Sequence, residues 1–156
     1  MNVTEELLKA WDPHKEAIRA ALTRLAHAPM PEGADFLWFV LRPNELIGMP
    51  IIVWPTGRDQ QQYDQWDCER ELIKAVPQSV TFPDELTGSV EAIDQLRNEV
   101  AQYLLRQWCA IVRPQDRLAY FSIDEDGYYF SLQDGRKISA WELEEEIGEA
   151  SSSQGA

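Results

Sequence analysis

The sequence has little of what most metal and nucleotide sites are built from. It contains two cysteines and two histidines in 156 residues, and its eight glycines occur singly along the chain. Zinc sites need closely spaced Cys or His ligands, and loops that bind phosphate need clustered glycines. Because neither pattern is present, we expect no cofactor and no bound metal ion.

A nucleophilic active site also has no sequence signature here. His14 and His27 lie near the expected first helix, and neither shares a motif with Cys68 or Cys109. Nucleophilic catalysis needs a base oriented next to a Ser or Cys side chain. We therefore expect a protein that is not an enzyme, with a carboxylate pair assembled in space as the alternative.

Long apolar runs are missing as well. No stretch of 18 apolar residues occurs, and the first six residues lack the basic and apolar regions of a secretory signal. We expect no membrane association and a cytoplasmic location. Two cysteines 41 residues apart are typical of buried thiols in a reducing compartment.

Positive charge is scarce. The chain has 14 basic and 27 acidic residues, a formal net charge of -13 and a pI near 4.5. This balance disfavours direct binding to nucleic acid, because phosphates repel an acidic surface. The last quarter is the most acidic, since residues 118–156 contain nine acids and two bases.

A hydrophobic fraction of 44% predicts a packed core, in a single α+β domain over residues 1–150 followed by a disordered tail at 151–156. Two apolar runs separated by Pro, Asn and Gly predict a hairpin over residues 35–54. Every residue from 36 to 41 is apolar, which favours a strand inside the sheet with both of its faces covered.

The rest of the chain supplies helices and a second group of strands. Asp-Gly occurs twice between alternating runs, so residues 118–139 are predicted to form a meander. The sheet is then mainly antiparallel with about five strands. Helices are predicted at 4–27 (kinked at Pro13), 60–76, 89–112 and 139–147.

The last predicted helix carries a stripe of carboxylates. Ser139 and Glu142 form a capping box at its start, and Gly148 is expected to end it. At 100° per residue, the stripe occupies one side of the helix opposite Leu143 and Ile147. Its members are Glu142, Glu145, Glu146 and Glu149. Like charges at this spacing cost stability, which suggests a function for the stripe, although solubility alone is the simpler explanation.

Two further features belong to the meander. The turn formed by Asp124, Glu125 and Asp126 has the carboxylates that a divalent cation prefers, but it lacks the spacing of a calcium loop. We interpret it as a solvated hairpin turn. Tyr120 and Tyr129 fall on the less apolar phase of their strands, so we expect both to face solvent.

These features favour recognition over chemistry. An acidic surface accelerates encounter with a basic protein and orients it. In its general character, small, acidic and without catalytic motifs, the chain resembles bacterial immunity proteins, and the resemblance implies an inhibitor that occludes a basic toxin or effector. No family motif supports it. The expected partner-binding residues are Asp124, Glu125, Asp126, Tyr129, Glu142, Glu145, Glu146 and Glu149.

A nucleic-acid mimic is the second class of function. Five glutamates in residues 142–149 span about 12 Å, or about 2.4 Å per charge, against about 1.7 Å per charge along duplex DNA. The density is comparable in this segment alone. Mimicry and the enzyme class remain open alternatives to a protein-binding module.

Overall fold

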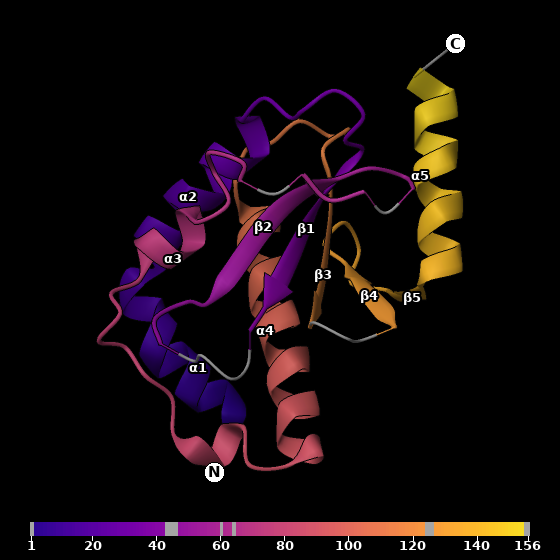
Figure 1. Ribbon diagram of the computed structural model, residues 1–156. Helices are drawn as coiled ribbons and strands as arrows, with labels where there is room; N and C mark the ends of the chain where they lie inside the picture. The colour runs from indigo at the N-terminus through magenta and orange to yellow at the C-terminus, as the bar shows by residue number, and fades with distance from the viewer. Residues whose placement is uncertain (1, 43–46, 60, 64, 124–126, 155–156) are drawn as a thin grey trace.

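A computed structural model describes residues 2–42, 47–59, 61–63, 65–123 and 127–154 (Figure 1). The fold is α+β, as predicted. Five strands form one mixed sheet in the order β2-β1-β3-β4-β5, and helices pack on both of its faces.

The predicted hairpin is present. Strands β1 (Phe36–Leu41) and β2 (Ile51–Thr56) pair antiparallel, with Trp38 opposite Trp54. Strand β1 lies between β2 and β3, and five of its six side chains are buried. The continuous apolar run therefore marks an interior strand with two covered faces.

The predicted meander is also present, and it joins the hairpin through a parallel pair. Strand β3 (Leu118–Ile123) runs parallel to β1, and β4 (Tyr128–Ser131) and β5 (Lys137–Ser139) continue the sheet antiparallel. Three of the four strand pairings are antiparallel. The parallel pairing is possible because a long helical connection separates β2 from β3.

Helices α1 (Val3–Trp11), α2 (Lys15–His27) and α4 (Val90–Ala110) cover one face of the sheet. A 3-10 turn at Asp12–His14 separates α1 from α2, so the break predicted at Pro13 is confirmed. Ser89 caps α4 by accepting a hydrogen bond from the Ala92 amide at 3.1 Å.

The helix predicted over residues 60–76 is wrong in extent. Only α3 (Glu71–Ala75) is helical, and the described residues before it run along β2, the edge strand. Backbone hydrogen bonds from Val53 to Glu69 (3.1 Å) and from Tyr63 to Pro55 (2.9 Å) join this segment to β2. The segment forms backbone hydrogen bonds with the open edge of the sheet instead of completing the helix that its local pattern predicted.

The last helix is longer than predicted. Helix α5 (Ala140–Gln154) continues past Gly148, where an end was expected, and into residues assigned to the tail. The Gly148 Cα lies against the guanidinium of Arg58, because a Cβ at this position would be 2.9 Å from Arg58 Nη2. Glycine therefore permits a close approach inside the helix instead of ending it.

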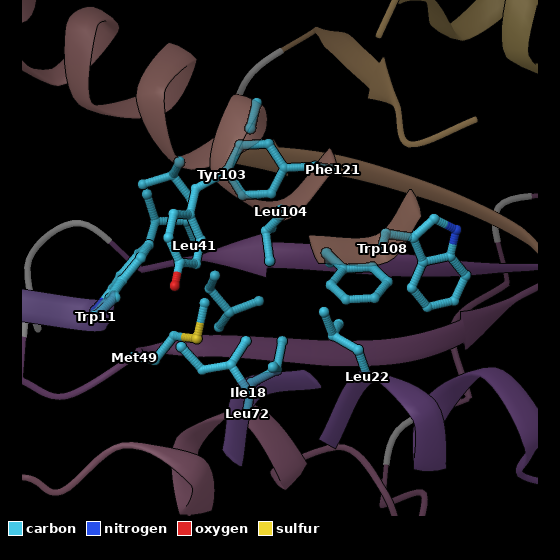
Figure 2. Packing of buried hydrophobic residues seen from close by; sticks show 14 of the residues in the cluster. Trp11, Ile18, Leu22, Leu41, Met49, Leu72, Tyr103, Leu104, Trp108 and Phe121 are labelled. Atoms are coloured by element: carbon cyan, nitrogen blue, oxygen red, sulfur yellow. The ribbon is translucent and has the colours of Figure 1, made fainter. Parts of the chain in front are cut away.

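The main core fills the space between the sheet and helices α1, α2 and α4 (Figure 2). Most of its side chains are aliphatic, and aromatic rings pack among them. The Trp11 ring meets Tyr103 and Phe82 edge-on at 5.3 and 5.5 Å, and Phe39 meets Trp108 at 5.8 Å. The Trp11 contacts join α1 to α4 and to the loop at Phe82, and the Phe39–Trp108 contact joins α4 to β1.

A second, smaller core lies on the opposite face of the sheet. Leu143 and Ile147 of α5 pack there against side chains of the strands, Phe36, Tyr120 and Ile138. Helix α5 follows β5 directly and lies beyond that edge of the sheet in Figure 1. Of residues 140–148, Leu143, Ile147 and Gly148 are buried, and most of the others are exposed.

Candidate protein-binding surface

The start of α5 is fixed by the predicted capping box. The Glu142 amide donates to Ser139 Oγ at 3.3 Å, and the Ser139 amide donates to Glu142 Oε1 at 3.4 Å. These bonds satisfy amide groups that the first helical turn leaves open.

The two sides of α5 differ sharply. Leu143 and Ile147 are buried, as the helical pattern predicted. On the outer side lies Trp141, 70% exposed, with exposed carboxylates next to it. Glu144 and Glu145 stand three and four residues after it, one turn along the helix. We call Trp141, Glu142, Glu144 and Glu145 the α5 surface.

Part of the predicted stripe has structural partners. Glu146 is half-buried, and its Oε1 lies 3.4 Å from Arg136 Nη2. Glu142 is held in the capping box. Among the described residues no ion pair or hydrogen bond engages Glu144 or Glu145. The free carboxylates of α5 therefore lie beside Trp141, and not along the predicted line.

Arg136 is the centre of a small charge network at this end of the sheet. Its Nε lies 2.6 Å from Asp134 Oδ2, in addition to the contact with Glu146. Burial alone would raise the pKa of Asp134, but hydrogen bonds from the Arg136 backbone and side chain outweigh it and lower that pKa. A lowered carboxylate pKa is typical of a structural ion pair and not of a catalytic acid.

Tyr120 and Tyr129 do not face solvent as predicted. Tyr120 is fully buried under α5, and Tyr129 is half-buried beside Trp38, with 6.1 Å between ring centroids. Burial raises the pKa of both hydroxyl groups, and the nearby Glu146 carboxylate raises that of Tyr120 further. The less apolar phase of these strands was expected to face solvent, but α5 covers the part of this face around Tyr120 and Ile138.

The Tyr120 hydroxyl has no partner in hydrogen-bond geometry within the described residues. An unsatisfied buried hydroxyl costs about 1–3 kcal/mol. We therefore expect Tyr120→Phe to leave the free energy of unfolding unchanged or to raise it by about 1 kcal/mol. Chemical denaturation at neutral pH measures the change.

Tyr103→Phe is the matched control, because the Tyr103 hydroxyl donates to Asp12 Oδ1 at 3.4 Å. This variant should lose about 1 kcal/mol of unfolding free energy.

The effect of Tyr120→Phe should also depend on pH. Because the pKa of the Tyr120 hydroxyl is raised in the folded state, its neutral form favours folding, and this contribution is complete below pH 10 and is lost as the pH rises further. The advantage of Tyr120→Phe should thus grow above pH 10. A clear loss at neutral pH would show that Glu146 accepts a hydrogen bond from this hydroxyl.

The turn predicted at Asp124, Glu125 and Asp126 lies outside the described residues. After it comes Tyr128, which is 51% exposed, with Lys137 Nζ 4.8 Å from its ring centroid. Tyr128 pairs with Ser139, two residues before Trp141. The side chain of Glu149, the last member of the predicted stripe, also lies outside the described residues.

Three further features concern metal ligands, cysteine burial and membrane-spanning helices. Within it, no three His, Cys, Asp or Glu side chains are grouped to hold a metal ion. The Cys109 side chain is exposed and Cys68 is half-buried, so the prediction of two buried thiols is wrong. Among the described helices, none combines the length and apolar composition that crossing a membrane requires.

A search of protein families, of curated proteins and of solved structures finds nothing that matches this chain. The function is therefore inferred from the residues themselves. Sequence reasoning missed Trp141 and Glu144 as surface residues. The signal was available, since the helical pattern places both outside the narrow apolar side formed by Leu143 and Ile147.

Proposed function

We propose that this chain is a protein-binding module that recognises a basic partner through the α5 surface. In its most specific form, it is an immunity-type inhibitor that occludes a cationic toxin or effector in the cytoplasm of a bacterium. The observation that supports this function best is a 70% exposed tryptophan surrounded by solvated carboxylates.

Tryptophan and carboxylates have complementary functions in such a surface. Trp141 offers a large apolar area whose burial by a partner is favourable, and tryptophan is enriched among the residues that dominate binding energy. Glu144 and Glu145 attract a cationic protein over a Debye length and orient its approach. At 70% exposure Trp141 buries little of its ring in the folded chain, so most of its apolar area is left for a partner.

Nucleic-acid mimicry is less well supported by the side chains. A mimic needs a long, continuous line of free negative charge. Here Glu146 is paired with Arg136, and Glu142 is held in the capping box. An apolar ring also interrupts the line, and it suits a protein partner better than a phosphate-binding groove.

Charge reversal tests the proposal. Glu144→Lys together with Glu145→Lys should slow association with the partner about tenfold or more at low salt and flatten the salt dependence. The fold should survive, because both side chains are exposed and no described residue pairs with them. Surface plasmon resonance at several ionic strengths measures the association rate.

The control is Glu16→Lys with Glu85→Lys, which changes the net charge equally at exposed positions away from α5. The first candidate partner is the product of the neighbouring reading frame, tested by co-purification and by relief of its toxicity. If both double variants slow association equally, the α5 carboxylates act only through net charge. If neither changes it, the proposal is wrong.

A further inference from the structure

The sheet face that carries α5 also presents a row of aromatic side chains. Trp54 of β2, Trp38 of β1 and Tyr129 of β4 are all half-buried on this face. The ring centroids lie 6.0 Å apart for the two tryptophans and 6.1 Å apart for Trp38 and Tyr129. We call these three residues the aromatic row. In Figure 1 no helix lies in front of β1 and β2 on this side.

The polar edges of the two tryptophans are already satisfied. Trp38 Nε1 donates to Ser122 Oγ at 2.6 Å, and Trp54 Nε1 donates to Glu69 Oε2 at 2.8 Å. These bonds fix both rings, so little freedom is left to lose on binding. What each ring still offers to a partner is its π surface, which carries partial negative charge and attracts cations.

The charges around the row favour a cationic occupant over an anionic one. At one end, Glu69 is half-buried against Trp54, and a carboxylate accepts more than one hydrogen bond. On another side lies α5 with its carboxylates. Arg136 is engaged by Asp134 and Glu146, and Arg58 lies against Gly148. The whole chain carries -13, and this net charge attracts cations at long range.

We propose that the aromatic row receives an arginine side chain of the basic partner. The two tryptophan rings are inclined by 63°, so the planar guanidinium would stack on one of them, Trp54, beside Trp38, while donating to the Glu69 carboxylate at the end of the row. Arginine fits better than lysine, because it is planar, stacks on rings and is more weakly hydrated. This inference rests on the proposed function, since it assigns the partner a second contact beside the α5 surface.

A short peptide tests the row without the partner. Acetyl-Gly-Arg-Gly-amide is titrated into the full chain, and the six tryptophan indole N–H resonances are followed by NMR. The Trp38 and Trp54 resonances should shift, while those of the buried Trp11 and Trp108 stay in place. The citrulline peptide, which has the same shape without the charge, should bind about fivefold more weakly.

Variants then locate the contact. Trp54→Leu should weaken arginine binding about fivefold, and Trp66→Leu should not. Trp66 is a fair control because it is also half-buried, and its Nε1 donates to the Pro29 carbonyl at 3.1 Å. Ring resonances of Tyr129 report whether the third member of the row takes part.

Each outcome has a distinct meaning. Equal affinity for the citrulline peptide or for a leucine peptide would show that the row does not recognise the positive charge, and it would overturn the proposal. Shifts that grow with protein concentration alone would overturn it as well. If only Trp141 responds to arginine, the row is wrong and the α5 surface stands. If the row responds but charge reversal at Glu144 and Glu145 leaves partner association unchanged, the row stands and the proposed function fails.

Discussion

Trp141→Ala should weaken binding to the basic partner by about 2 kcal/mol or more, close to a thirtyfold loss of affinity, and leave the fold intact. Trp141 is the most exposed aromatic side chain among the described residues, so its removal opens no cavity. Alanine also favours the helix more than tryptophan does. The free energy of unfolding should therefore stay within about 0.5 kcal/mol of the original.

Val112→Ala is the matched control for that loss, since Val112 is an 84% exposed apolar residue outside α5. Calorimetric titration should show full affinity for this variant. Trp141→Ala should mainly accelerate dissociation, whereas charge reversal at Glu144 and Glu145 should mainly slow association. An unchanged dissociation rate for Trp141→Ala would show that Trp141 does not lie in the interface.

The sequence predicted the elements whose pattern is local, set by the burial of neighbouring residues or by turn residues. An unbroken apolar run gave β1, two Asp-Gly turns gave the meander, and the apolar stripe gave α4. The parallel pairing of β1 with β3 left no local trace, because it joins residues more than 80 positions apart. The helix predicted over residues 60–76 contains α3 but is too long for a related reason, since the edge of β2 decides the conformation of the segment before α3.

The candidate surface was predicted only in outline. The helical periodicity gave the buried side of α5 correctly. It could not distinguish the four glutamates of the predicted stripe from one another. Their separation depends on Arg136, which comes from the β4–β5 turn and pairs with Glu146, and on the capping box, which occupies Glu142. Tyr120 was expected in solvent because alternation along a strand cannot show that a later helix will cover the polar phase.

Trp11→Ala is expected to have the largest effect on stability, a loss of about 3–5 kcal/mol. Trp11 is fully buried, ends α1, and contacts Phe82 and Tyr103 edge-on. Its Nε1 also donates to the Gly48 carbonyl at 3.1 Å. The substitution leaves a cavity where α1, α4 and the β1–β2 connection meet, and it leaves that carbonyl without its donor.

For a domain of this size the loss corresponds to a fall in Tm of roughly 6–20 °C, which calorimetry resolves easily. Trp66→Ala provides the comparison, because the Trp66 indole makes the same type of bond to a backbone carbonyl from a half-exposed position. It should cost clearly less than Trp11→Ala, since solvent can reach the freed carbonyl and the vacated space. Equal losses at the two positions would mean that the hydrogen bond, and not burial, dominates. In that case the bond to Gly48, and not the aromatic cluster, would be what holds α1 to the domain.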